Sequence, residues 1–172
     1  MGGGRDVPPG RWLSWWGSRA PRARPTNHPG VETIESKDLA FSIARIIDEK
    51  QADDIAILDV SGPLVIADYF VVASARNQRH ARALASDLIR AMKQEGRLCR
   101  HTAGAEGGSN WVLLDFDDVV VHLFQAEARS FYDLESLWAD VPRVEFVHTA
   151  REVAPTWESL GDSSYPDSGD SV

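Results

Sequence analysis

The sequence predicts an α/β or α+β fold, in which one mixed β-sheet is flanked by helices. Segments with helical spacing of apolar residues mix with strand-like segments, in the order helix, strand, strand, helix, strand, strand, strand, helix. One strand segment, residues 69–74, is apolar almost throughout, which is typical of a strand covered on both faces. We therefore expect residues 69–74 to lie at the centre of the sheet.

The first two elements are a helix over residues 36–51 and a strand that ends near residue 60. Apolar residues recur at helical spacing along the helix, at Leu39, Ile43, Ile46 and Ile47. Ser36 can cap its first turn, because a serine hydroxyl accepts backbone N–H groups there. The strand is predicted from the alternation of Ile55, Ile57 and Val60. A Ser-Gly-Pro sequence at 61–63 then predicts a turn.

The second helix is predicted between a capping Asn77 and a terminating Gly96. Its apolar residues form one stripe, consisting of Ala81, Leu84, Ala85, Leu88 and Met92. The opposite face is charged, so we expect it to face solvent. Residues 98–101 predict a short strand, which a glycine-rich loop at 104–108 follows.

The last elements are a β-hairpin and a helix. Residues 111–114 and 119–124 predict two strands joined by the tight turn Asp115-Phe116-Asp117-Asp118. A helix over about residues 127–138 follows and ends before Pro142. Its large apolar residues crowd more than one face, at Phe131, Tyr132, Leu134, Leu137 and Trp138. Unaided, a helix buries one stripe, so this crowding needs an explanation.

The predicted folded domain spans residues 36–145, between two segments of unlike composition. Residues 1–30 are rich in Gly, Pro and Arg, a composition that cannot build a packed core. We expect this head to be disordered or to result from a start codon assigned too far upstream; an Arg-rich transit peptide is a third alternative. The acidic tail over 146–172 is expected to be disordered.

Composition narrows the classes of partner. The formal net charge of −8 lacks the basic field of a protein that grips nucleic acid, so we expect direct nucleic-acid binding not to be the main contact. The single cysteine, Cys99, excludes an intramolecular disulfide and fits a reducing, cytoplasmic location. No apolar run approaches the roughly 20 residues that span a bilayer, so we expect no membrane partner.

The three aspartates of the hairpin turn admit two interpretations. Asp115, Asp117 and Asp118 could hold a divalent metal in a nucleotidyltransferase-like enzyme, because hard cations prefer carboxylate oxygens from a short segment. Aspartate is also favoured in turns, where it bonds nearby backbone. The glycine-rich loop lacks a following Gly-Lys-Ser/Thr, and the histidines lack metal-ligand spacing. We therefore expect no catalysis, cofactor or metal, and keep the enzyme as the alternative.

Two aromatic residues have the character of a binding patch. Trp111 opens a strand just after the glycine-rich loop, and Tyr132 with Asp133 lies on a crowded helix. From pattern alone, Tyr132 and Asp133 either face solvent beside a sheet edge or belong to a docking patch, where aromatics are enriched. His122 falls inside an apolar strand, where it is expected in the core or facing a partner.

Three linked segments closely resemble the ribosomal silencing factor (Iojap) family. They are Asp-Tyr-Phe-Val-Val at 68–72, Trp-Val-Leu-Leu-Asp at 111–115 leading into Asp-Val-Val-Val-His-Leu-Phe at 118–124, and Ala-Arg-Ser-Phe-Tyr-Asp-Leu-Glu-Ser-Leu-Trp at 128–138. The resemblance covers about residues 36–144, and order and spacing both match. Two departures are Asp117 and Ala75, where the family usually has glycine. Aspartate tolerates the same turn conformation.

This resemblance implies a nucleotidyltransferase-like fold without catalysis and a role as a translational repressor. It implies binding to the large ribosomal subunit through its protein fourteen, which obstructs joining of the small subunit when nutrients are scarce. The family's docking tryptophan, tyrosine and adjacent acid fall on Trp111, Tyr132 and Asp133. Further candidate contact residues within the same motifs are Asp68, His122 and Arg129. A homodimer of the free protein is a further expectation.

Overall fold

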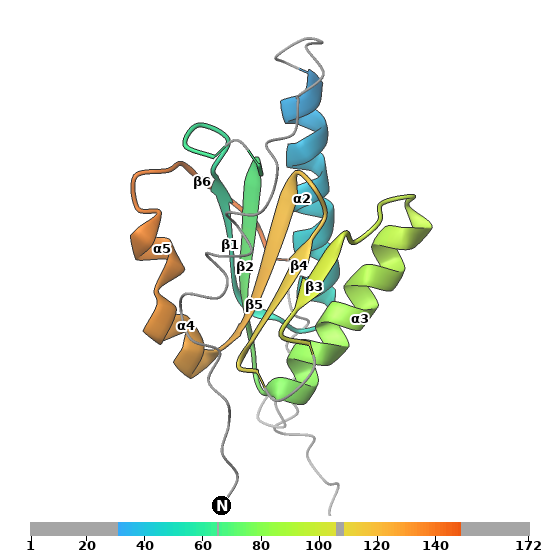
Figure 1. The fold of residues 1–172 in the computed structure, drawn as a ribbon, viewed down its shortest axis with the longest axis vertical. Coiled ribbons are helices and arrows are strands. Elements are labelled where there is room, and N and C mark those ends of the chain that lie inside the picture. Colours follow the sequence, from blue (N-terminus) through green and yellow to red (C-terminus); the bar gives the residue numbers. More distant parts are fainter. Residues whose placement is uncertain (1–30, 65, 106–108, 149–172) are drawn as a thin grey trace, which may run out of the picture.

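The computed structural model describes residues 31–64, 66–105 and 109–148. The helices in this part of the chain are α2 (Val31–Glu49), α3 (Gln78–Gln94), α4 (Ala126–Tyr132) and α5 (Leu134–Leu137). The strands are β1 (Asp53–Asp59), β2 (Tyr69–Ala75), β3 (His101–Ala103), β4 (Trp111–Asp115), β5 (Val119–Gln125) and β6 (Arg143–Val144). Figure 1 shows these elements around one sheet. The residues predicted to be disordered at 1–30 and beyond 148 lie outside the described ranges.

The strands form a mixed sheet in the order β3-β4-β5-β2-β1-β6, which confirms the predicted fold class. β2 and β5 run parallel, with Tyr69 opposite Val119 and Ala75 opposite Gln125. The other neighbouring strands are antiparallel. Every residue of β2 is buried, as predicted for a central strand.

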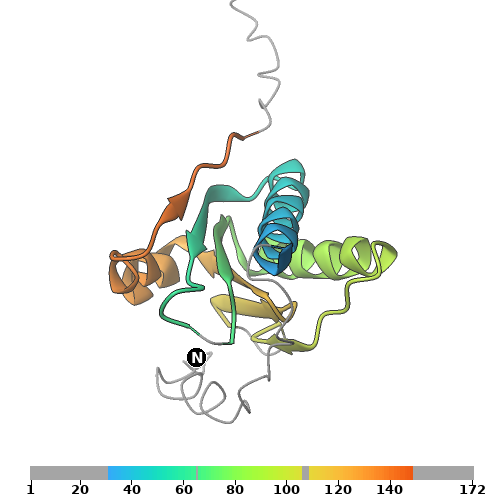
Figure 2. The same ribbon diagram turned by 90° about the horizontal axis from the view of Figure 1, so that it is seen from above.

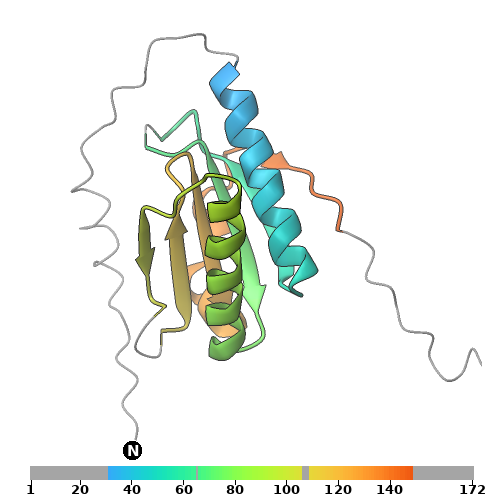
Figure 3. The same cartoon turned by 90° about the vertical axis from the view of Figure 1, so that its right-hand side faces the viewer.

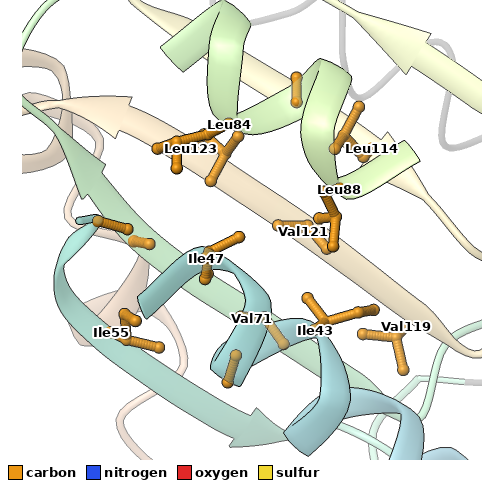
Figure 4. Packing of buried hydrophobic residues seen from close by; sticks show 14 of the residues in the cluster. Ile43, Ile47, Ile55, Val71, Leu84, Leu88, Leu114, Val119, Val121 and Leu123 are labelled. Atoms are coloured by element: carbon orange, nitrogen blue, oxygen red, sulfur yellow. The ribbon is translucent and has the colours of Figure 1, made fainter. Parts of the chain in front are cut away.

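Helices cover both faces of the sheet. Helices α2 and α3 pack on one face, and α4 with α5 lies on the other (Figures 2 and 3). Figure 4 shows side chains of α2 and α3 meeting those of β2, β4 and β5, among them Ile43, Leu88 and Val121. These side chains form the larger apolar cluster of the core. A smaller apolar cluster on the other face joins β1, β2, β4 and β5 to Ala128 and Leu134. Burial on both sides explains why β2 and β5 lack alternating polar residues.

Helix α3 begins and ends where its sequence predicts. The Asn77 side chain accepts a hydrogen bond from the His80 backbone N–H at 2.9 Å. Gly96 has a φ of +78°, and its N–H donates to the Lys93 carbonyl at 3.1 Å. The Arg97 N–H donates to the Met92 carbonyl at 2.8 Å. These paired bonds close the helix through a left-handed residue, a conformation that glycine adopts without strain.

The first helix differs from its predicted start. It begins at Val31, so Ser36 lies within it and the predicted cap is wrong. The Ser36 side chain is buried, and its hydroxyl donates to Asp68 Oδ2 at 2.8 Å. A bond to a residue 32 positions away leaves no local signal in the sequence. The short strand predicted at 98–101 is also displaced, because pairing with β4 fixes it at residues 101–103.

The predicted last helix is broken in two. Asp133 adopts a left-handed conformation with φ 39° and ψ 56°, which ends α4 and starts the single turn of α5. Its N–H still donates to the Arg129 carbonyl at 2.8 Å. Beyond α5, the two-residue strand β6 pairs with Ile57 and Leu58, and neither its existence nor its place was predicted.

Residues 146–148, which follow the predicted domain boundary, pack back on α2. The Phe146 ring lies 6.5 Å from the Phe41 ring, centroid to centroid. His148 Nδ1 lies 3.1 Å from Asp48 Oδ1. In the described residues, no helix combines the length and apolar character needed to cross a membrane.

Candidate docking surface

The structure brings Trp111 and Tyr132 together at one end of the sheet. Trp111 opens β4 and lies opposite Phe124 of β5, and β5 leads directly into α4, which ends at Tyr132. The ring centroids of Trp111 and Tyr132 are 5.1 Å apart. Both side chains are only partly buried, although they border the smaller apolar cluster. The hairpin thus carries a residue 21 positions away into contact with the last turn of α4.

Trp111 and Tyr132 belong to a group of aromatic side chains in contact with one another, here called the aromatic cluster: Phe70, Trp111, His122, Phe124 and Tyr132. The Trp111 ring stacks on Phe124 at 5.1 Å and on His122 at 5.6 Å between centroids. Phe70 meets the His122 ring edge-on at 5.0 Å. Aromatic contacts of this kind are worth about 0.5–1.5 kcal/mol each beyond the area they bury. The cluster therefore holds Trp111 and Tyr132 in defined positions.

His122 belongs to this cluster as an uncharged ring. Its side chain is 3% exposed, and neither ring nitrogen has a hydrogen-bond partner among the described residues. Burial lowers its pKa from 6.5 to about 3, because the imidazolium would lose its hydration. The structure therefore places this candidate contact residue beneath the surface, where it supports Trp111.

Exposed groups extend the surface beyond the two anchoring rings. Phe131 is 76% exposed and meets Tyr132 edge-on, with 5.2 Å between ring centroids. Asp133 follows directly and is also exposed. Its left-handed backbone turns the chain at this point, a conformation that aspartate tolerates better than most residues. We call Trp111, Phe131, Tyr132 and Asp133 the docking surface.

Arg129 fixes the position of α4 instead of projecting from it. Its guanidinium donates to the Asp54 carbonyl at 2.6 Å and to Ser74 Oγ at 2.8 Å, which ties α4 to β1 and β2. It also forms an ion pair with Glu135, and its Nε donates to that carboxylate at 3.1 Å. The Arg129 side chain is only 15% exposed. Arg129 is therefore a positioning residue for the neighbouring Tyr132.

Asp68 lies at the opposite end of the sheet. It precedes β2, and its N–H donates to the Asp118 carbonyl at 2.8 Å, beside the hairpin turn. Trp111 pairs near the other end of β5, opposite Phe124. The structure therefore does not bring Asp68, a candidate contact residue in the sequence, to the docking surface.

The aspartates of the hairpin turn serve the turn itself. Asp115 is fully buried, and its Oδ1 accepts the Asp117 N–H at 2.9 Å. Asp117 has a φ of 70° and binds Arg100, with 2.9 Å between Oδ2 and Nε. Across residues 31–64, 66–105 and 109–148, no group of three or more His, Cys, Asp or Glu side chains is placed to hold a metal ion. These contacts favour the structural interpretation of Asp115 and Asp117.

A hollow of about 500 Å³ was not predicted from the sequence. It is lined by residues from the segments 59–63 and 137–142, among them Trp138 and Asp140. Asp59 Oδ1 already accepts the Ser61 hydroxyl at 2.6 Å. Two segments about eighty positions apart meet through the pairing of β1 with β6 and through a hydrogen bond from the Asp59 N–H to the Pro142 carbonyl. Local pattern could therefore not reveal the hollow.

Known proteins are similar to this chain in sequence and in fold. A family model described as "Ribosomal silencing factor during starvation" matches residues 33–165. A protein named ribosomal silencing factor RsfS from Halalkalibacterium halodurans is 32% identical over 112 residues, which cover 65% of this chain and 95% of that protein. The protein of the same name from Bacillus subtilis is 34% identical over 109 residues, covering 63% and 92% of the two chains. A crystal structure of a Bacillus halodurans protein is 30% identical, with a TM-score of 0.57, and the match covers 64% of this chain and 99% of that one.

Proposed function

We propose a function from the family to which this chain belongs, the ribosomal silencing factors. The proposed function is that the chain binds protein fourteen of the large ribosomal subunit and thereby blocks joining of the small subunit. Family membership gives the chain a regulatory role in translation. The proposed binding to protein fourteen rests on one observation, which is the aromatic and acidic docking surface built from Trp111, Phe131, Tyr132 and Asp133.

The composition of this surface suits a protein partner. Binding energy at protein interfaces is concentrated in a few aromatic anchors that lose their remaining water on contact. Trp111 and Tyr132 are partly buried already and are braced from behind by Phe124 and His122, so little side-chain freedom is lost on binding. Asp133 adds a carboxylate at the rim, which can pair with a cation of a basic ribosomal protein.

The proposed mechanism is steric and requires no chemical step. A domain of about 120 residues has a diameter of roughly 30 Å, which is large enough to keep the facing surfaces of the two ribosomal subunits apart. Repression then depends on affinity and on the fraction of large subunits occupied. The cytoplasm is the proposed site of action, and a homodimer is the proposed form of the free chain.

The contacts of the hairpin turn favour the regulatory role over the alternative of a nucleotidyl transferase. A nucleotidyl transferase would need the carboxylates of Asp115, Asp117 and Asp118 to converge on a metal in an open site. Asp115 is buried and bonds its own turn, and Asp117 is engaged by Arg100. The named relatives are silencing factors, which is a regulatory role.

Subunit joining measured by light scattering tests the proposed function. Purified large subunits are first incubated with saturating full-length protein and are then mixed with small subunits. We expect the extent of joining to fall in proportion to the fraction of large subunits that carry the protein. Normal joining by large subunits that demonstrably carry the protein would contradict a steric block.

A further inference from the structure

The charge of this acidic chain is distributed unevenly. Although the formal net charge is −8, residues 76–100 contain two acids, Asp87 and Glu95, against seven basic residues. The basic residues are Arg76, Arg79, Arg82, Arg90, Lys93, Arg97 and Arg100. This segment therefore has a local charge of +5, seven minus two, and most of it is helix α3.

The cations follow one side of α3. An α-helix turns about 100° per residue, so Arg79, Arg82, Arg90 and Lys93 fall within an arc of roughly 80°. Arg97 lies just beyond the helix, after the left-handed Gly96, and is also exposed. The buried stripe of α3, which includes Leu84 and Leu88, is centred about 145° away on the same wheel. The four cations of α3 therefore point away from the sheet. Together with Arg97 they are here called the basic stripe (Arg79, Arg82, Arg90, Lys93 and Arg97).

Most of the basic stripe is not neutralised by the residues that the structure describes. All five side chains belong to exposed residues. Arg79, Arg82, Lys93 and Arg97 form no ion pair with any other described residue, whereas Arg90 pairs with Asp87. An ordinary solvated helix face alternates opposite charges at spacings of three and four residues, which stabilises the helix. This face instead concentrates a single sign of charge.

We propose that the basic stripe of α3 binds the phosphate backbone of ribosomal RNA while the docking surface holds a ribosomal protein. The stripe from Arg79 to Lys93 is about 21 Å long, at 1.5 Å of rise per residue, so it presents a row of cations to a row of phosphates. Phosphate contacts of this kind add affinity and orientation without reading sequence. A membrane surface is a poorer fit, because the apolar face of α3 is used by the core.

The stripe and the docking surface reach the same end of the molecule. Helix α3 starts directly after β2, and Gln78 Nε2 lies 3.5 Å from the Ser109 carbonyl oxygen, two residues before Trp111. Figure 1 shows the start of α3 and helix α4 at the same end of the sheet. A ribosome presents protein and RNA side by side, so both contacts can form at once. This inference rests on the proposed function for the identity of the RNA.

Salt dependence of binding to purified large subunits tests the proposal. The stripe variant replaces Arg79, Arg82, Lys93 and Arg97 with Gln in the full chain, and its melting temperature checks folding. Each lost phosphate contact lowers the slope of log K against log salt by about 0.9, so the slope should fall by about 3 to 4. At 0.1 M salt we expect affinity to fall at least tenfold. An unchanged slope and affinity would overturn the proposal.

A matched pair of variants separates the stripe from net charge. Arg82→Gln with Lys93→Gln and Lys37→Gln with Arg45→Gln each remove one Arg and one Lys from exposed positions on a helix. The first pair should lower the slope by about 2 and the second should leave it unchanged. Equal effects of the two pairs would mean that only the overall charge matters, which overturns the proposal.

Binding to a fluorescent 20-base-pair RNA duplex tests the basic stripe independently of the ribosome. This assay is decisive if the wild-type chain does not bind large subunits, an outcome that would by itself refute the proposed function. At low salt the wild type should bind the duplex at least tenfold more tightly than the stripe variant, whereas Tyr132→Ala should bind it like the wild type. If neither chain binds the duplex, or if both bind it equally, the basic stripe does not bind phosphates.

Discussion

At the scale of single residues, His122 shows how burial sets a chemical property. Its ring lies between Trp111 and Phe70 and has lost its contact with water. In the unfolded chain the pKa would be near 6.5, whereas in the folded protein it is lowered to about 3. A group whose folded pKa is lowered binds protons more readily in the unfolded state, so acid favours unfolding below about pH 6.5.

We therefore expect His122 to make the protein sensitive to mild acid. Between pH 7 and pH 5 the linked loss in free energy of unfolding is about 2 kcal/mol, and it continues to grow until pH 3. His122→Phe keeps a ring in the cluster and should remove this part of the pH dependence. Urea unfolding at both pH values measures it, with His101→Gln as the control that should behave like the wild type. Identical pH dependence in His122→Phe and the wild type would contradict the assignment.

At the scale of elements, the position of α4 depends on Arg129. This side chain joins α4 to the Asp54 carbonyl, to Ser74 and to Glu135 of α5, and it is mostly enclosed. Removing one member of an enclosed ion pair leaves the other charge without its partner, which is costly. Tyr132 lies three residues further along the same helix, so a shift of α4 would move the docking surface.

Arg129→Ala should lower the free energy of unfolding by about 3 kcal/mol, because it deprives Glu135 of its cation and Ser74 of its donor. Chemical denaturation measures this loss. Arg45→Ala, at an exposed position on α2, is the control and should change stability by less than about 0.5 kcal/mol. If Arg129→Ala were as stable as the control, Arg129 would not be a positioning residue.

The sequence predicted most elements because their signals are local. Helix α3 carries a cap, an apolar stripe and a terminating glycine, and the β4–β5 hairpin carries turn-forming aspartates. The break between α4 and α5 was missed, because the left-handed backbone of Asp133 leaves no periodic signal. Strand β6 was missed because two residues are too few to show an alternation, and its pairing with β1 is long-range.

At the scale of the whole molecule, the candidate site was predicted in part. Chain connectivity alone predicted that Trp111 and Tyr132 meet, because the hairpin returns alongside Trp111 and leads directly into α4. The family motifs suggested Asp68 and Arg129 as contact residues, but a motif does not show which of its residues are exposed at the site. Asp68 lies at the far end of the sheet, and Arg129 is enclosed. Net charge was a poor guide to the surface, because a sum of −8 over the whole chain conceals the basic stripe on α3.

The most direct measurement concerns Tyr132→Ala, assayed for binding to purified large subunits and for thermal unfolding. Because Tyr132 is a partly exposed anchor, we expect affinity to fall by about 2 kcal/mol, roughly thirtyfold, at a temperature where the variant is still folded. The lost ring contacts with Trp111 and Phe124 should lower the melting temperature without unfolding the domain at that temperature. Leu98→Ala removes another exposed apolar side chain outside the docking surface and is the control that should bind normally. Wild-type affinity in folded Tyr132→Ala, or a loss of binding that only follows unfolding, would contradict a docking site built on Tyr132.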